Sequence, residues 1–100
     1  MASSPIDISP ALVRDVRFGK GTLIVDLVDG RTLSVPLSWY PRLAYGTAEE
    51  LASWKLIGPG HGIHWPELDE DLSVESLLAG RRSGEGQQSL KRWLEDRGKS

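Results

Sequence analysis

The stretch TLIVDLVDGRTLSV, residues 22–35, decides the fold of this chain. Apolar side chains occupy every second position on both sides of its centre: Leu23, Val25, Leu27, Leu33 and Val35. A period of two is typical of a strand that buries one face. The two halves are joined by Asp29-Gly30, a dipeptide that favours the tight turn of a β-hairpin. The stretch therefore predicts two antiparallel strands with these five side chains directed inward.

A further strand is predicted immediately before this hairpin, over residues 12–18, with a connection at Gly19-Lys20-Gly21. Its alternation places one set of side chains on the inner face: Leu12, Arg14, Val16 and Phe18. Val13 is then an apolar residue on the solvent-facing side of the strand, so the period of two holds only in part. Pro36 cannot donate a ladder hydrogen bond and ends the third strand. These three strands form a predicted antiparallel meander.

The second half of the chain predicts shorter elements. Thr47 and Glu50 have the spacing of a capping box, which begins a helix at Ala48 that runs to about Trp54. Residues 37–43 predict an irregular or single-turn segment, and one or two short strands are predicted at 55–58 and 62–65. Ser73 caps a helix over residues 74–79. Strands followed by short helices predict an α+β fold, a small antiparallel sheet packed with two short helices.

Three regions follow from this pattern: a flexible arm at residues 1–10, one α+β domain at 11–80 and a basic amphipathic tail at 81–100. After a Gly-rich linker at 83–86, the tail predicts a helix from Gln87 to about Arg97. Leu90, Trp93 and Leu94 form an i, i+3, i+4 stripe on it. Because an isolated helix of this length is marginal in water, the stripe must cover a surface, either on the chain's own body or on a partner.

Composition and charge exclude several classes of function. The chain has 100 residues and no Cys, which excludes disulfides, thiolate zinc sites and thiol nucleophiles. It has neither a long apolar run nor a signal-like N-terminus, so we expect a cytoplasmic protein without a membrane span. Residues 1–80 have a net charge of −5 and residues 81–100 of +3. An acidic body disfavours nucleic acid as a partner.

Five residues form a candidate ligand site: Trp39, Tyr40, His61, His64 and Asp69. Two histidines with nearby carboxylates invite a metal interpretation. In an extended segment, however, a spacing of three directs the two imidazoles to opposite faces, so we predict no metal or cofactor. Ser38 with a histidine and Asp69 would complete a hydrolase triad on paper, but there is no nucleophile-elbow motif and we predict no enzyme.

Several segments together resemble one bacterial family, domain of unknown function 2442, over residues 10–80. They include RDVR at 14–17, YPRL at 40–43 and, most specifically, GIHWPELDEDLSV at 62–74. The resemblance implies a small α+β domain, sometimes fused to a helix-turn-helix, with no catalytic residues that could be transferred. It also implies a gene often found beside a small partner family, domain of unknown function 4160, an association that has prompted suggestions of toxin–antitoxin pairing.

The leading hypothesis is a non-enzymatic protein-interaction domain, the antitoxin-like partner of a small protein encoded nearby. Leu90, Trp93 and Leu94 would anchor that partner, with Arg92 at the rim. A small-ligand or metal-binding domain is the alternative, a transcriptional regulator is a weaker one, and homo-oligomerisation stays open.

Overall fold

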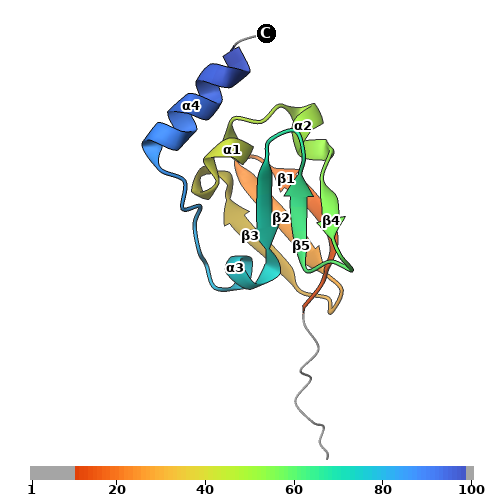
Figure 1. Cartoon of the computed structure of the whole chain (residues 1–100). Helices are drawn as coiled ribbons and strands as arrows, with labels where there is room; N and C mark the ends of the chain where they lie inside the picture. The colour runs from red at the N-terminus through yellow and green to blue at the C-terminus, as the bar shows by residue number, and fades with distance from the viewer. Residues whose placement is uncertain (1–10, 99–100) are drawn as a thin grey trace, which may run out of the picture.

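The computed structural model describes residues 11–98 and confirms the α+β class. It has two three-stranded antiparallel sheets, several short helices and a C-terminal helix (Figure 1). The arm predicted at residues 1–10 lies outside the described residues. None of the helices in the described part of the chain is long and apolar enough to cross a membrane.

The first sheet is the predicted meander. Its strands are β1 (Val13–Gly19), β2 (Thr22–Leu27) and β3 (Thr32–Pro36), in the order β1-β2-β3. On β2, Leu23, Val25 and Leu27 are fully buried, as the alternation predicts. The hairpin at Asp29-Gly30 places Gly30 at φ 97°, in the left-handed region that glycine adopts without strain.

The inward face predicted for β1 is wrong at its start. The register shifts between Val13 and Asp15, which marks a β-bulge. The bulge places both Val13 and Val16 in the core, at 2% and 6% exposure, and leaves Arg14 in solvent. An extra residue in one strand reverses the inside–outside alternation beyond it, so a strict period of two could not apply here.

The short strands form a second sheet of their own rather than an extension of the meander. It contains β4 (Lys55–Ile57), β5 (Gly62–Trp65) and β6 (Glu70–Ser73), in the order β4-β5-β6. Two of these strands were predicted, but β6 was not, because acidic residues dominate its start. Leu72 is its one buried side chain, and pairing with β5 supplies the rest of its stability.

Short helices connect and cap the two sheets. They are the 3-10 turn η1 (Leu37–Trp39), α1 (Pro41–Ala44), α2 (Ala48–Ala52) and α3 (Val74–Leu78). Both predicted N-caps are present: Thr47 and Glu50 form the capping box of α2, and the Ser73 hydroxyl accepts from the Ser76 amide. Helix α2 ends at Ala52, two residues earlier than predicted, because the chain must turn to enter β4.

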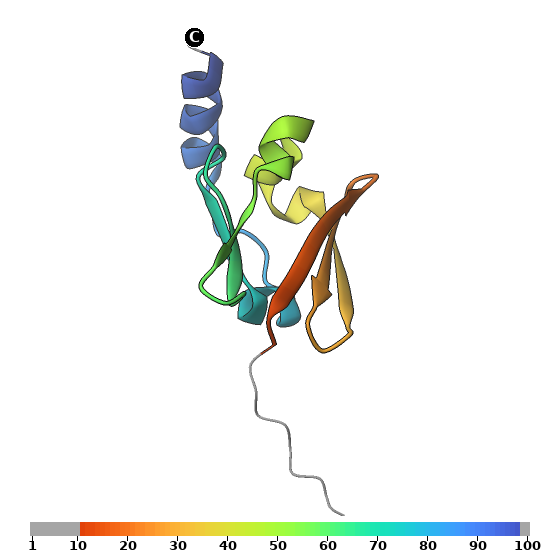
Figure 2. The same ribbon diagram turned by 90° about the vertical axis from the view of Figure 1, so that its right-hand side faces the viewer.

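The two sheets lean together at one end and diverge at the other, with α1 and α2 at the open end (Figure 2). Both sheets contribute to one core, in which Trp65, Leu68 and Ile63 are fully buried. At the closed end the Val13 amide donates to the Gly60 carbonyl at 2.8 Å. A Cβ on Gly60 would lie 2.8 Å from the Val13 carbonyl oxygen, so only glycine allows this approach.

Helix α4 (Gln87–Gly98) follows a stretch without regular structure and stands beside the open end of the sheets (Figures 1 and 2). We call residues 11–80 the body. The predicted tail helix is thus confirmed as an element, and the way it is attached defines the first part of the site.

Candidate functional site

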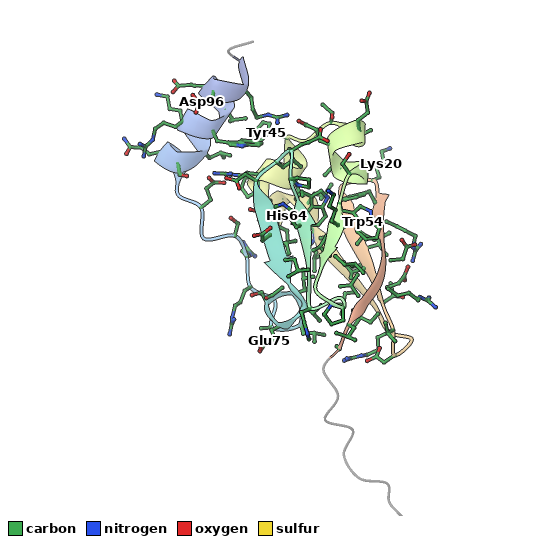
Figure 3. All side chains as sticks on the ribbon, turned by 45° about the vertical axis from the view of Figure 1, so that its right-hand side comes forward. Lys20, Tyr45, Trp54, His64, Glu75 and Asp96 are labelled. Atoms are coloured by element: carbon green, nitrogen blue, oxygen red, sulfur yellow. The ribbon has the colours of Figure 1, made fainter. Side chains whose placement is uncertain are left out.

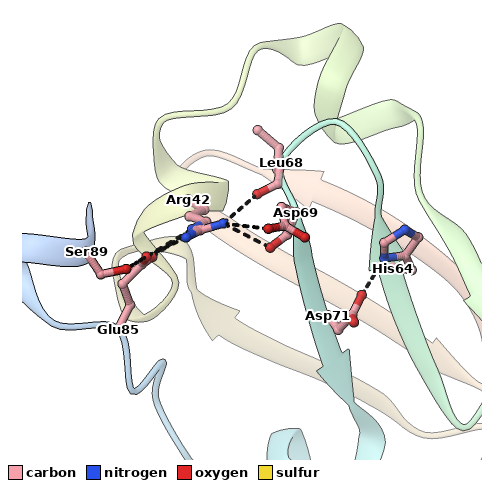
Figure 4. A network of polar contacts seen from close by, with 7 residues as sticks. All are labelled: Arg42, His64, Leu68, Asp69, Asp71, Glu85 and Ser89. Atoms are coloured by element: carbon pink, nitrogen blue, oxygen red, sulfur yellow. Dashed lines mark hydrogen bonds and ion pairs between the residues drawn. The ribbon is translucent and has the colours of Figure 1, made fainter. Parts of the chain in front are cut away.

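Arg42 on α1 holds the segment that leads into α4 (Figure 4). Its guanidinium donates to both carboxylate oxygens of Glu85, at 2.9 Å from Nε and 2.7 Å from Nη2. Nη1 also donates to the Asp69 carbonyl at 3.1 Å. The Arg42 and Glu85 side chains are only 16% and 10% exposed. This charge-assisted pair therefore contributes more than a surface ion pair would, and it holds the pKa of Glu85 below its usual range.

A second ion pair fixes the far end of α4. Arg97 donates from Nη1 and Nη2 to the two carboxylate oxygens of Glu50, at 2.9 and 2.8 Å. The same carboxylate accepts from the Thr47 amide at 2.9 Å in the capping box of α2. Hydrogen bonds from Arg97 first, and then from Thr47, lower the pKa of Glu50 to about 2. Glu50 thus stabilises α2 and binds α4 with one carboxylate.

Trp93 lies between the two arginines of these pairs. The guanidinium carbons of Arg42 and Arg97 are 5.1 and 4.6 Å from the centre of its ring, within cation–π range. Trp93 is half-buried and packs against the core of the body. Of the two surfaces open to it on sequence grounds, this structure places Trp93 on its own body. We call the Arg42–Glu85 pair, the Arg97–Glu50 pair and this stack the α4 latch.

The other two residues of the predicted stripe are placed differently. Leu90 and Leu94 are half-buried but do not belong to the hydrophobics packed against the core. They line a shallow hollow of about 370 Å³ formed by α4 alone, together with Gln87, Lys91 and Glu95. Arg92 is exposed. The stripe is therefore divided between Trp93, which docks on the body, and the two leucines, which do not.

Trp39 and Tyr40 hold the segment between α3 and α4. The buried Tyr40 hydroxyl donates to the Arg81 carbonyl at 2.8 Å, and the Ser83 amide donates to the Trp39 carbonyl at 3.0 Å. The Arg82 guanidinium carbon lies 4.9 Å from the centre of the Trp39 ring. Burial raises the pKa of Tyr40, so its hydroxyl stays a donor at neutral pH.

An open groove of about 500 Å³ lies between β6 and this segment. Its polar and charged lining residues are Tyr40, His61, Glu70, Asp71, Ser73, Ser76, Arg81, Arg82 and Ser83. Two of the five predicted ligand residues, Tyr40 and His61, are thus brought together here. Trp39 does not line the groove, but its ring stacks with Arg82, which does. The sequence marked Glu70 only as one of several carboxylates near the two histidines, because strand β6, which places it beside the groove, was not predicted.

The remaining two predicted ligand residues are not in the groove lining. His64 pairs through Nδ1 with Asp71, its partner across β5 and β6 (Figure 4). The Asp69 side chain is 90% exposed in a turn with φ 52°, beside Arg42. Within residues 11–98, no group of three or more His, Asp or Glu side chains could hold a metal ion.

Comparison with known families decides which group of proteins this is. A family model described as "Protein of unknown function (DUF2442)" matches residues 13–83. The chain belongs to the DUF2442 family. No curated protein matches it. The DUF2442 match covers both sheets, α1, α2, α3 and residues 81–83, which contact Trp39 and Tyr40, whereas α4 begins beyond it.

Two solved structures share the fold of this DUF2442 protein. The crystal structure of a protein of unknown function from Rhodospirillum rubrum superposes with a TM-score of 0.66 and 29% identity, over 77% of this chain and 95% of that one. The solution structure of an uncharacterized protein from Chromobacterium violaceum gives a TM-score of 0.63 and 25% identity, over 81% and 75%.

Proposed function

We propose that this chain is a cytoplasmic, non-enzymatic protein-interaction domain, and that the outward side of α4 is its docking surface. One observation carries the proposal: Leu90 and Leu94 stay outside the core on a helix whose neighbouring Trp93 is already docked. The latch holds the helix in place, so the two leucines are presented in a fixed geometry. Pre-ordering of this kind lowers the entropic cost of association.

The charges beside the leucines favour a particular kind of partner. Lys91 and Arg92 are exposed and make no ion pair within residues 11–98, whereas Arg42 and Arg97 are both committed to carboxylates. The surface therefore fits a protein that presents apolar side chains bordered by carboxylates. A small protein encoded nearby, to which this chain would be the antitoxin-like partner, is the candidate that family membership favours.

The test is capture of partners by the tagged full-length chain from its native host. A double variant, Leu90→Glu with Leu94→Glu, is compared with Leu56→Glu, a control on the body whose side chain is 40% exposed. Each captured protein is identified by mass spectrometry, purified and titrated back by calorimetry. We expect one small acidic-faced protein to bind the wild type and the control alike, and the double variant at least about tenfold more weakly.

Equal binding by the double variant and the wild type would show that the docking surface is not on α4. Absence of any partner that rebinds in purified form would contradict the proposed function as a whole.

A further inference from the structure

The groove beside β6 has walls of opposite charge. Glu70 and Asp71 line it from the strand, and Arg81 and Arg82 line it from the segment after α3. Both arginines are exposed and make no ion pair with any residue from 11 to 98. Arg82 is nevertheless positioned, because its guanidinium stacks over Trp39, and the Arg81 backbone is fixed by Tyr40. The Arg82 guanidinium is thus both positioned and available, and the exposed Arg81 side chain extends from a fixed backbone.

Glu70 on the opposite wall lacks a donor. Its side chain is half-buried, yet among the described residues it makes no hydrogen bond or ion pair. A carboxylate taken partly out of water without a donor is destabilised, because protein groups do not replace the lost hydration. Burial is accordingly the first cause that raises the pKa of Glu70, to about 7.

Neighbouring charges leave this deficit in place. Asp71, Asp69 and Glu85 raise the pKa of Glu70 further, and only Arg42 lowers it. Arg42 donates its hydrogen bonds to Glu85, Leu68 and Asp69, so none of them reaches Glu70. A bound group that brings a cationic N–H donor would complete the site.

We propose that the groove binds a small zwitterionic ligand, of the class of free amino acids and dipeptides. Its ammonium group donates to the Glu70 carboxylate, and its carboxylate accepts from Arg81 and Arg82. A purely cationic ligand would be repelled by the two arginines, and a purely anionic one would leave Glu70 without a donor. The groove volume of about 500 Å³ falls within the range of small-molecule sites. This site is separate from the leucines of α4 and stands whether or not α4 binds a protein.

The test is a titration of the full chain followed by amide chemical shifts in nuclear magnetic resonance. The probes are L-alanine, the dipeptide alanyl-alanine and the other common amino acids. Propionate, which lacks the amine, and ethylamine, which lacks the carboxylate, are the matched controls. We expect saturable shifts at residues 70–73 and 81–84 with at least one zwitterion. If that ligand is alanine, the Kd of propionate and of ethylamine should each be at least about tenfold larger than the Kd of alanine.

Two variants check the assigned roles. Glu70→Gln keeps the size of the side chain but removes its charge, and it should weaken the binding of the zwitterion at least about tenfold. Glu67→Gln, an exposed carboxylate in the turn before β6 and outside the groove lining, should bind as the wild type does. The chemical shift of the Glu70 carboxyl carbon gives an independent readout, since it follows the titration of this group. The pKa of Glu70 should fall when the ligand saturates the groove.

Absence of saturable shifts at these residues with every probe, up to about 10 mM, would overturn the proposal. It would also be overturned if propionate bound as tightly as alanine and Glu70→Gln changed nothing, because the groove would then be an anion site on the arginines alone.

Discussion

On β2, Leu23, Val25 and Leu27 are fully withdrawn from water, whereas none of residues 87–98 of α4 is fully buried. The body is therefore held mainly by apolar burial, at roughly 1.5–3 kcal/mol for each large side chain. Helix α4, which stands at the edge of the body (Figure 3), is held by the latch, which consists of two ion pairs and a stack of two arginines on one tryptophan. The difference teaches that two parts of one small protein depend mainly on different variables: the stability of the body on side-chain volume, and the docking of α4 on charge, salt and pH.

The largest expected effect is the difference in unfolding free energy when leucine is replaced by alanine in each of the two regions. Leu23→Ala in β2 should cost about 3 kcal/mol of unfolding free energy, because it leaves a cavity in a closed core. Leu94→Ala on α4 should cost less than about 0.5 kcal/mol, since this side chain does not pack against the core. Urea unfolding of the two variants measures both values, and similar losses would show that α4 is part of the hydrophobic core.

Arg42→Ala should detach α4 while the body stays folded. The substitution removes one ion pair and one face of the Trp93 stack, and it leaves the Glu85 carboxylate, 10% exposed, without its main donor. We expect a loss of about 2 kcal/mol in the docking of α4, which corresponds to roughly 30-fold faster amide exchange in residues 87–98.

The matched control is Arg92→Ala, an exposed arginine on α4 outside the latch. It should leave exchange in residues 87–98 unchanged. Equal effects of the two substitutions would mean that the latch does not hold the helix.

Acid should release α4 before it unfolds the body. The pKa of Glu50 is lowered from 4.5 to about 2, so its contribution is fully present above about pH 4.5 and is lost as pH falls through the range from 4.5 to 2. The lowered pKa of Glu85 acts in the same direction. Exchange in residues 87–98, compared with that in β2 along a pH series, measures the release. In Glu50→Gln, acid should accelerate exchange in residues 87–98 less than in the wild type. An equal acceleration in both would mean that other groups cause the release of α4.

Glu70 on the body should respond to pH with the opposite sign. Because its pKa is raised from 4.5 to about 7, the stability of the folded state declines as pH rises through this range. Glu70→Gln should remove the penalty and stabilise the protein by about 1 kcal/mol at pH 8, with no gain at pH 4. Urea unfolding at both pH values measures the difference, and a loss of stability at pH 8 would mean that the carboxylate has a donor after all.

Local signals in the sequence predicted those elements that depend on neighbouring residues. The alternation and the Asp29-Gly30 turn predict sheet β1-β2-β3, and Thr47 with Glu50 predicts the start of α2, because each depends on residues a few positions apart. The bulge in β1 was missed, since its extra residue shows only in the pairing with β2. Strand β6 was missed for a related reason: pairing with β5 stabilises an acidic segment that has little strand propensity of its own.

The site was predictable only in its parts. The stripe on α4 was found from its spacing. The sequence could not decide whether Trp93 docks on the body or on a partner. The latch joins residues that are far apart in the sequence: Arg42 and Glu85 are separated by 43 positions, and Glu50 and Arg97 by 47. No local pattern marks such pairs, because the fold brings them together. The groove likewise depends on β6 and residues 81–84 lying side by side.

Amide hydrogen exchange at low and high salt tests the central claim of this account most directly. Raising the salt to about 1 M shortens the Debye length to roughly 3 Å and weakens above all the pair that water reaches more easily, Arg97–Glu50, whose side chains are 27% and 18% exposed. We predict that exchange in residues 87–98 accelerates severalfold while exchange in β2 is unchanged. If α4 and β2 kept the same relative protection at both salt concentrations, α4 would not be held by charge, and the contrast between the two regions would be wrong.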